Sequence, residues 1–341
     1  MFKKNFYLII FLSVLILVAL LIYIKPYYEL VHEITGVSPL KILITNGSYK
    51  KNDSKVTIVL LGKAGGLHDG PNLTDSIIVA SYDISKNRVT VISLPRDIWS
   101  TSLSDKINSA YAYGEAKKKG AGMVLAKAEV GAIVGLPIHY AVVIDFDKFK
   151  ELIDYFGGID VVVDKSFNDN KFPISGREND TCNGDLEYKC RYESVSFKQG
   201  LQHMNGETAL KYVRSRNAQG EEGTDFARNK RQEKILKSMS EKIMSTARSR
   251  DLNKIRGMYY LLDKIIARDI SNPEAAYIVK KIITKKGFNI NQFALSEDLF
   301  IVPKKSDYKG KYVLIPTNGS FGSIHGYVRC LIEKADSIKC H

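Results

Sequence analysis

The chain begins with an apolar stretch that restricts what the rest of it can be. Residues 6–24 carry no charged side chain, and Ser13 is their only polar residue that is not aromatic. As an α-helix this stretch is about 28 Å long, close to the roughly 30 Å hydrocarbon core of a bilayer. It ends in aromatic and basic residues, as at a membrane interface, and not in the small residues of a cleavage site. We therefore expect an uncleaved signal anchor; a cleaved signal peptide is the alternative.

The basic residues that flank this stretch favour one orientation only slightly. Lys3 and Lys4 precede it, whereas Lys25 and Lys41 follow it. The positive-inside rule thus favours a cytoplasmic N-terminus. No later segment is both long and apolar enough to cross a bilayer, so we expect a single-pass membrane protein with everything after residue 28 outside the cytoplasm.

The four cysteines support an exported location. They form two close pairs, Cys182 with Cys190 and Cys330 with Cys340, and neither pair has the CxxC spacing typical of zinc sites. Short, even pairing in an anchored protein favours two disulfides formed in an oxidising compartment. Four free thiols are the alternative.

Charge and composition narrow the class of partner. Fifty Lys and Arg residues against 37 Asp and Glu residues give a net charge of +13, and 45% of the residues are apolar. This composition excludes a disordered, collagen-like or polytopic membrane chain. A positive charge favours nucleic acid, anionic lipid or phosphate-rich substrates. No basic helix with base-reading spacing is present, and an exported domain does not reach the chromosome, so we expect no nucleic acid partner.

The remainder of the chain alternates strand and helix patterns. Val- and Ile-rich runs bounded by Gly, Asn or Pro predict strands, and Ala-, Lys- and Glu-rich runs predict helices. The predicted strands cover residues 55–61, 75–82, 88–94, 139–145 and 159–163, and the predicted helices cover residues 110–134, 147–155 and 224–248. This order predicts a layered α-β-α domain with a central, mostly mixed β-sheet, preceded by one N-terminal transmembrane helix.

The same features divide the chain into segments. A cytoplasmic stub and the anchor occupy residues 1–28, and a polar juxtamembrane linker with little structure of its own follows over residues 29–55. The main domain covers residues 56–300, with its motifs in 62–232 and a polar surface insertion at 166–196. Residues 301–341 extend the same domain.

An arginine-rich segment is the strongest candidate for binding an anion. Arg214 and Arg216 share one face if the backbone there is extended, which requires the preceding helix to end before them. Arg228, Arg231 and Gln232 share or border one helix face in the first turns of a helix capped by Thr224 or Asp225, where free N–H groups favour anions. Guanidinium groups bind phosphate oxygens in pairs. The alternative is a solvated face with surface ion pairs.

Two further segments follow predicted strands. Ser93-Leu94-Pro95-Arg96-Asp97 places Arg96 beyond a strand end, where ligands of α/β folds bind, and Lys106 adds a nearby charge. A local ion pair between Arg96 and Asp97 is the alternative.

The second of these segments is a glycine-rich turn over residues 62–70. It includes Gly65, Gly66 and His68, and its N–H groups can face phosphate, although no Walker A sequence is present. Asp75, which opens the next strand, is the best single carboxylate for a divalent ion such as Mg²⁺.

In order along the chain, these motifs closely resemble the LytR-CpsA-Psr family over residues 56–240. The resemblance is carried by Leu73-Thr74-Asp75-Ser76, Ser93-Leu94-Pro95-Arg96-Asp97, Lys106-Ile107-Asn108-Ser109-Ala110-Tyr111, Phe156-Gly157-Gly158-Ile159-Asp160-Val161, Asn205-Gly206-Glu207-Thr208-Ala209-Leu210-Lys211-Tyr212-Val213-Arg214-Ser215-Arg216 and Asp225-Phe226-Ala227-Arg228-Asn229-Lys230-Arg231-Gln232.

The resemblance implies a membrane-anchored enzyme that works outside the cytoplasm. Members transfer a glycopolymer from a polyprenyl-pyrophosphate carrier to a peptidoglycan or other wall hydroxyl, and the prenyl chain enters an apolar pocket between sheet and helices. The resemblance implies Mg²⁺, with Mn²⁺ as the alternative, and membrane lipid as a partner. It assigns Asp75 to the metal and six residues to the pyrophosphate, namely Arg96, Lys106, Arg214, Arg216, Arg228 and Gln232. Asp75 and the arginines Arg96, Arg214, Arg216 and Arg228 are the implied catalytic residues.

Two positions depart from the family pattern. Ala64 stands where many members have an Asp, and Leu73 stands where many have an Arg, so one metal ligand and one phosphate contact are missing. Gly65, Gly66 and His68 are hypothetical substitutes, and neither Asp75 nor Asp97 is assigned as the base. The alternatives are a carrier-binding protein without transfer, a pyrophosphatase, a non-catalytic anchor that binds anionic wall polymer, and an envelope-linked transcriptional attenuator.

Overall fold

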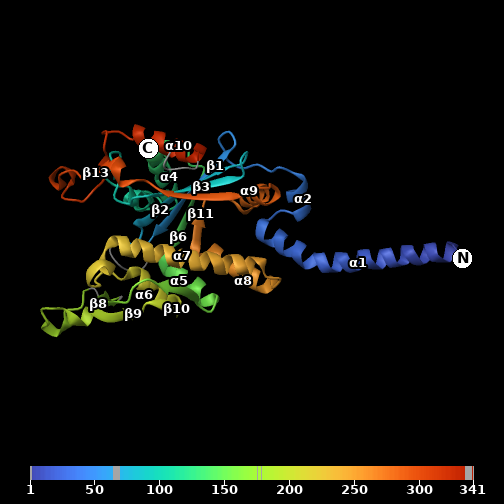
Figure 1. The fold of residues 1–341 in the computed structure, drawn as a ribbon, viewed down its shortest axis with the longest axis horizontal. Helices are drawn as coiled ribbons and strands as arrows, with labels where there is room; N and C mark the ends of the chain where they lie inside the picture. The colour runs from blue at the N-terminus through green and yellow to red at the C-terminus, as the bar shows by residue number, and fades with distance from the viewer. Residues whose placement is uncertain (1, 64–69, 175, 178, 335–339, 341) are drawn as a thin grey trace.

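The computed structural model describes residues 2–63, 70–174, 176–177, 179–334 and 340 (Figure 1). Its helices are α1 (Phe2–Thr35), α2 (Pro39–Ile44), α3 (Ala110–Lys117), α4 (Gly122–Val134), α5 (Phe146–Tyr155), α6 (Gly206–Arg214), α7 (Asp225–Arg248), α8 (Leu252–Ile265), α9 (Asn272–Thr284) and α10 (Gly322–Lys334). Its strands are β1 (Lys55–Lys63), β2 (Thr74–Asp83), β3 (Arg88–Leu94), β4 (Trp99–Ser100), β5 (Asp105–Lys106), β6 (Tyr140–Asp145), β7 (Ile159–Val163), β8 (Phe167–Pro173), β9 (Tyr192–Phe197), β10 (Gly200–Met204), β11 (Ile266–Arg268), β12 (Asn289–Ala294), β13 (Phe300–Ile301) and β14 (Ile315–Pro316).

The central sheet is mixed, as the sequence predicts. Among the described residues, its strands follow the order β11-β6-β1-β2-β3-β12. The pairs β1–β6 and β3–β12 are parallel, and the pairs β1–β2, β2–β3 and β6–β11 are antiparallel. The carboxyl ends of β1, β3 and β6 therefore lie at the same edge of the sheet as the start of β2.

Alternate residues of the four inner strands β6, β1, β2 and β3 are buried on one face of the sheet. Val59 and Leu61 of β1 and Ile77 and Val79 of β2 are at most 2% exposed. They pack in one core with apolar residues of α4 and α10, which lie on the same side of the sheet in Figure 1. The alternating Val, Ile and Leu side chains of these strands thus pack the sheet against its first layer of helices.

The opposite face of the sheet is apolar but only half-buried over its centre. Leu60, Ile78 and Val142 lie on this face and are intermediate in exposure. Towards the other end of the strands the same face is closed by α9, whose Ile278 packs in a small core with Tyr82.

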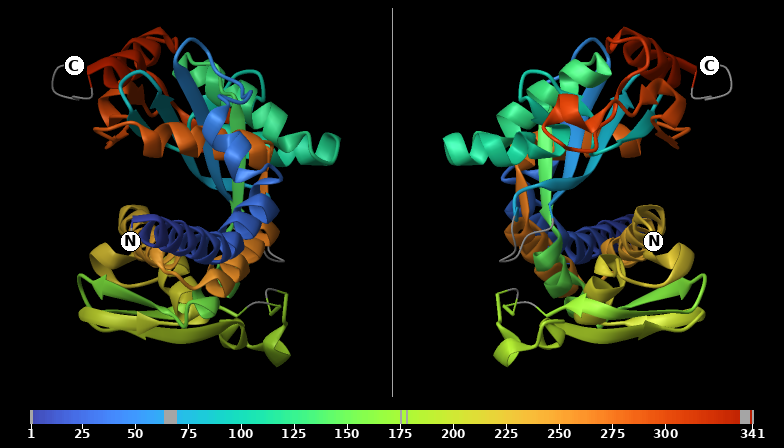
Figure 2. Two further views of the ribbon diagram at one scale, coloured as in Figure 1. Left: turned by 90° about the vertical axis from the view of Figure 1, so that its right-hand side faces the viewer. Right: turned by 90° about the vertical axis from the view of Figure 1, so that its left-hand side faces the viewer.

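Residues 146–265 form a second lobe that is inserted into the sheet. The chain leaves the sheet at the end of β6 and returns as β11, and these two strands are antiparallel neighbours that pair Ile144 with Ile266. The lobe has its own core, which includes the fully buried Leu152, Met204 and Met239. Figure 2 shows this lobe below the sheet in both views.

The insertion predicted over residues 166–196 is a β-hairpin of β8 and β9 that ends in a disulfide-closed loop. Cys182 is bonded to Cys190, and Cys330 is bonded to Cys340, so the prediction of two disulfides is confirmed. No cysteine is left unpaired.

The expected linker is wrong as a description of residues 29–55. α1 continues through Pro26 to Thr35, and α2 follows after a short turn with Ser38 as its N-cap. Proline at the first position of α2 suits a helix start because its missing N–H would have no partner there. In the described part of the chain, one helix is long and apolar enough to cross a membrane, over Leu15–Thr35 of α1.

Two helix boundaries also differ from the prediction. The helix expected over residues 110–134 is divided into α3 and α4 around Gly120, whose φ of +85° interrupts a right-handed helix. α6 ends at Arg214, so the helix does not stop before Arg214 and Arg216, and only Arg216 lies outside it.

Leu152→Ala is expected to destabilise the second lobe by about 2–5 kcal/mol, because Leu152 is 0% exposed and its removal leaves a cavity. Leu201→Ala is the matched control in the same lobe. Leu201 is 72% exposed, so its truncation should change stability by less than about 0.5 kcal/mol. Urea denaturation measures both. Equal effects of the two changes would contradict a packed core in this lobe.

Candidate active site

The first candidate group lies at the edge of the sheet where β1, β3 and β6 end. Lys63 is the last residue of β1 and pairs in register with Asp145 of β6 and Thr74 of β2. Asp75 follows Thr74, and Arg96 comes two residues after the end of β3. Four elements therefore bring charged side chains to one place.

Arg96 is joined to two carboxylates. Its Nη1 lies 2.6 Å from Asp75 Oδ1, and its Nε lies 3.6 Å from Asp97 Oδ2. Lys106 Nζ lies 2.6 Å from Asp97 Oδ1. The local ion pair considered from the sequence is present, but the stronger contact of Arg96 is the one with Asp75 across the sheet edge.

The Lys106 segment is held against both neighbouring loops. The backbone N–H of Asn108 donates to the Arg96 carbonyl, and the Thr74 hydroxyl donates to the Asn108 carbonyl. Burial raises the pKa of the neighbouring Asp105, but hydrogen bonds from Lys311, Tyr113 and the Lys106 N–H outweigh it, so this pKa lies below its ordinary value. The ionised Asp105 fixes the start of the segment that carries Lys106.

Lys63 is a member of this group that the sequence reasoning missed. Its Nζ lies 3.4 Å from Asp145 Oδ2 and donates to Asn72 Oδ1 at 3.0 Å. The side chain is 21% exposed, similar to Arg96 and Lys106. Its place at the end of a buried strand, beside another strand end, is the pattern that would have identified it.

The group holds three cations and three carboxylates, as a series Asp75–Arg96–Asp97–Lys106 and a neighbouring pair Lys63–Asp145. The cations are Lys63, Arg96 and Lys106, and the carboxylates are Asp75, Asp97 and Asp145. All six side chains are 12–24% exposed, so the pairs are partly desolvated yet open to a ligand. A cluster of this kind can exchange a carboxylate partner for a phosphate oxygen. We call it the sheet-edge cluster.

The glycine-loop predictions lie outside the described residues. Gly65, Gly66, His68 and the departure Ala64 all fall within residues 64–69. Leu73 is described, and its N–H donates to the Gly70 carbonyl in a turn just before β2.

The second candidate group surrounds the junction of α6 and α7. Arg214 ends α6 and is half-buried, Arg216 is exposed in the following loop, and Gln232 is half-buried on α7. Arg228 is 3% exposed in the first turn of α7. Thr224 caps this helix by accepting from the Ala227 N–H, as predicted. We call this set the α6–α7 arginines; α7 lies on the side of the second lobe that faces the sheet (Figure 1).

Arg231 serves to hold this junction together. It is 2% exposed, and its guanidinium donates to the carbonyls of Tyr212, Ser215 and Glu222 as well as to the Glu222 carboxylate. Burial lowers the pKa of Arg231, whereas burial raises the pKa of Tyr212 to about 12, so the phenol stays neutral beside it. Arg231 thus fixes the end of α6 and with it the backbone of Arg214.

Asp169 of β8 fixes the backbone that follows. This carboxylate is 0% exposed and accepts the N–H groups of Arg216, Asn217 and Lys171 at 3.0–3.2 Å. The predicted insertion therefore contributes directly to the position of Arg216. The sequence reasoning missed this role because it depends on a contact between residues 47 positions apart.

Contacts between described side chains thus join Asp75, Arg96 and Lys106 in the sheet-edge cluster. Arg214, Arg216, Arg228 and Gln232 gather separately on the second lobe. The two groups lie on the two lobes that meet at the β6–β11 pair.

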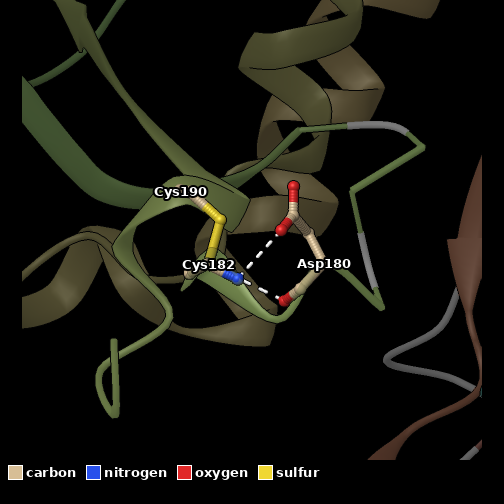
Figure 3. A group of neighbouring side chains, drawn as sticks. All are labelled: Asp180, Cys182 and Cys190. Atoms are coloured by element: carbon tan, nitrogen blue, oxygen red, sulfur yellow. Dashed lines mark hydrogen bonds between the residues drawn. A yellow bond between two sulfur atoms is a disulfide. The ribbon is translucent and has the colours of Figure 1, made fainter. Parts of the chain in front are cut away.

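One group of described side chains has the spacing of a metal site. Among the described residues, Asp180, Cys182 and Cys190 are the only three His, Cys, Asp or Glu side chains close enough together to share an ion. Figure 3 shows that both sulfurs are bonded to each other and that the Cys182 N–H donates to Asp180, so this set is a disulfide loop without thiolate ligands. Asp75, the predicted Mg²⁺ ligand, has its Oδ1 paired with Arg96, and its assignment to a metal stays a prediction.

Comparison with known proteins decides the family. The profile of the LytR-CpsA-Psr family matches residues 32–325, which is most of the chain. The chain belongs to the LytR-CpsA-Psr family. The match covers the sheet, the second lobe and both candidate groups, and it confirms the resemblance found in the ordered motifs.

Several curated relatives are similar to this LytR-CpsA-Psr protein. The polyisoprenyl-teichoic acid–peptidoglycan teichoic acid transferases TagV of Bacillus subtilis and TagU of Bacillus cereus are 32% and 30% identical over 188 and 211 residues. These regions are 53% and 60% of this chain but 42% and 59% of the relatives. Regulatory protein MsrR of Staphylococcus aureus is 29% identical over 213 residues, 61% of this chain and 55% of MsrR. The chain thus spans about half the length of these relatives.

The crystal structure of B. subtilis TagV shares the fold of this LytR-CpsA-Psr protein. It superposes with a TM-score of 0.53 at 22% identity and covers 83% of this chain and 99% of TagV as crystallised. The layered mixed α/β architecture is therefore that of the family.

Asp169→Ala is expected to release the segment that carries Arg216, because three backbone N–H groups lose their acceptor. Stability should fall by about 3 kcal/mol, and hydrogen exchange at the amides of Arg216 and Asn217 should quicken. Asp185→Ala is the control, since that exposed carboxylate accepts N–H groups within the disulfide loop only. Unchanged exchange at Arg216 in Asp169→Ala would contradict the positioning role.

Proposed function

We propose that this protein is a membrane-anchored phosphotransferase that works outside the cytoplasm. It moves a glycopolymer from a polyprenyl-pyrophosphate carrier to a hydroxyl of peptidoglycan or another wall acceptor and releases polyprenyl phosphate. The observation that carries the proposal is the position of the sheet-edge cluster, with its three cations held by carboxylates, at the end of a half-buried apolar sheet face. The carrier has a charged pyrophosphate, which suits the cluster, and a long apolar prenyl chain, which suits the sheet face.

The apolar sheet face suits the prenyl chain. Leu60, Ile78 and Val142 lie side by side on three neighbouring strands, Val91 of β3 lies on the same face opposite Ala80, and all four apolar residues are half-buried. Covering such a surface with a prenyl chain is favourable by about 25 cal/mol per Å² of apolar area removed from water. The sheet-edge cluster lies where β1, β3 and β6 end and β2 begins. A prenyl chain on this face of the sheet would therefore place its pyrophosphate at the cluster.

The cations of both groups suit the chemistry of phosphoryl transfer. Arg96 and Lys106, which are held by Asp75 and Asp97 in the structure, exchange these carboxylates for pyrophosphate oxygens. Arg214, Arg216, Arg228 and Gln232 complete the contacts from the second lobe. Charge on the transferred group and on the leaving phosphate is then neutralised by fixed donors, which accounts for most of the catalysis of such reactions.

The bond changes are those of one displacement. The acceptor hydroxyl oxygen bonds to the phosphorus that carries the glycopolymer, and the bond from this phosphorus to the bridging oxygen breaks. The bridging oxygen leaves with polyprenyl phosphate, and the hydroxyl proton passes to water or to a carboxylate, for which Asp75 and Asp97 are the candidates. Mg²⁺ or Mn²⁺ held by Asp75 would supply further positive charge to the pyrophosphate when bound.

The relatives and the N-terminus support this assignment over the alternatives. TagV and TagU carry teichoic acid transfer to peptidoglycan in their names, whereas MsrR is named as a regulatory protein. α1 supports a single-pass anchor, Lys3 and Lys4 favour a cytoplasmic N-terminus, and two disulfides suit an oxidising compartment on the other side. An exported domain of this kind has no access to DNA, which argues against transcriptional attenuation.

The proposal is tested with the full-length protein in detergent micelles and a polyprenyl-pyrophosphate oligosaccharide. Release of polyprenyl phosphate should require Mg²⁺, should stop with EDTA, and should fall by about 10²–10³-fold in Arg214→Ala plus Arg216→Ala. Acceptor saccharide in the assay separates transfer from hydrolysis, because hydrolysis gives the free phosphorylated oligosaccharide. Binding of the lipid without release would leave a carrier-binding protein and refute the phosphotransferase.

Lys63→Ala tests whether Lys63 compensates for Leu73, which stands where many relatives have an arginine. Lys63 lies beside Thr74 at the sheet edge and supplies a cation there, so its loss should lower turnover by about 10²-fold. Lys86→Ala is the control, because the exposed Lys86 contacts the Glu333 carbonyl away from the cluster. Unchanged turnover in Lys63→Ala would exclude Lys63 from the site.

A further inference from the structure

The short helix α2 presents an apolar face that the domain does not cover. Leu40, Leu43 and Ile44 are 61%, 63% and 74% exposed, and their spacing places them on one side of the helix. Ile42, on the opposite side, is 8% exposed and packs against the domain. Three large apolar side chains exposed together are unusual on a soluble surface and indicate a partner.

α2 is held firmly enough for this face to have a fixed direction. Lys280 of α9 donates to the carbonyls of Leu43 and Thr45 at 2.7 and 2.8 Å. The Thr45 hydroxyl lies 3.1 Å from the Tyr277 hydroxyl, and Lys281 donates to Asn46. α2 is thus part of the folded domain, and α9 adds the exposed Ile283 near its end.

The end of α1 is fixed to the same side of the domain. Leu30 is 4% exposed, and Glu33 accepts hydrogen bonds from Arg256 at 3.1 Å and from Tyr260 at 2.5 Å on α8. In Figure 1, α2 and α9 lie on the side of the molecule from which α1 leaves. A bilayer crossed by α1 therefore lies next to α2.

Basic residues stand on the same side. Arg248, Arg250 and Lys254 are exposed around the turn between α7 and α8, and Arg250 is within electrostatic range of Tyr27 on α1. Cations next to exposed apolar side chains are the combination that binds anionic membrane surfaces.

We propose that the exposed face of α2 and the basic α7–α8 turn form a membrane-contact surface that lies on an anionic phospholipid bilayer. Its residues are Leu40, Leu43, Ile44, Arg248, Arg250 and Lys254. This inference rests on α1 spanning the membrane, as in the proposed function, and adds a second contact that sets the orientation of the domain. The domain is then held at the lipid surface instead of moving freely on a tether.

Tryptophan fluorescence in the full-length protein tests this surface. Ile44→Trp is made in a Trp99→Phe background, so that the introduced tryptophan is the only one in the chain. The protein is reconstituted in phosphatidylglycerol-containing vesicles whose phosphatidylcholine is brominated in the upper acyl chain. A side chain buried about 5–10 Å into the interface should lose roughly half of its fluorescence to bromine. Val124→Trp is the control, because Val124 is 64% exposed on α4, away from this side.

Each outcome separates the inference from the proposed function. Quenching of Ile44→Trp well above that of Val124→Trp supports the surface, and equal quenching overturns it while α1 still anchors the protein. Protein that fails to float with the vesicles refutes the anchor itself. The Ile44→Trp side chain could instead show no quenching by lipid and become shielded from solvent as the protein concentration in detergent rises. This result assigns the face to a second copy of the chain and overturns the membrane contact.

A charge-reversed variant tests the basic turn. Arg248→Glu with Arg250→Glu and Lys254→Glu should reduce the quenching of Ile44→Trp in vesicles with phosphatidylglycerol to the level seen in vesicles without it, and added salt should have the same effect on the parent protein. Quenching that is unaffected by charge reversal removes the turn from the surface.

Discussion

The antiparallel pairing of β6 with β11 is the constraint on which the rest of the structure depends. The chain leaves the sheet after Asp145 and returns at Ile266, so the whole second lobe is attached through this one pair of neighbouring strands. Asp145 belongs to the sheet-edge cluster, and α5 begins at the next residue. The end of β6 thus both joins the two lobes and contributes Asp145 to the sheet-edge cluster.

The two halves of the candidate site are built by different physical means. The sheet-edge cluster follows from strand register, because parallel strands end at a common edge and their last residues become neighbours. The α6–α7 arginines depend on buried polar contacts instead, with Arg231 binding three backbone carbonyls and Asp169 accepting three backbone N–H groups. Buried charges that are fully hydrogen-bonded hold a loop in one conformation, and losing either partner is costly.

The apolar surfaces of the molecule divide into one covered and one partly open sheet face, and the open face is the one on which the proposed lipid substrate would lie. One sheet face is sealed by α4 and α10, while the centre of the other face is half-buried and ends at the sheet-edge cluster. α1 and α2 are fixed to α8 and α9 by hydrogen bonds, so the side from which α1 leaves is defined. In the proposed function, a lipid carrier that enters from a membrane on that side would meet a domain of fixed orientation.

The sequence by itself determined four strands of the central sheet (β1, β2, β3 and β6), the disulfide pairs, the start of α7 and the family, because these depend on local periodicity, spacing or ordered motifs. It also identified Arg96 and Lys106 as neighbours beyond the sheet. Only the tertiary structure decided that Lys63 and Asp145 join them, that Asp169 holds the Arg216 backbone, and that α2 is ordered. These features arise from contacts between residues far apart in the chain, where strand register and side-chain burial act together and local pattern carries no information.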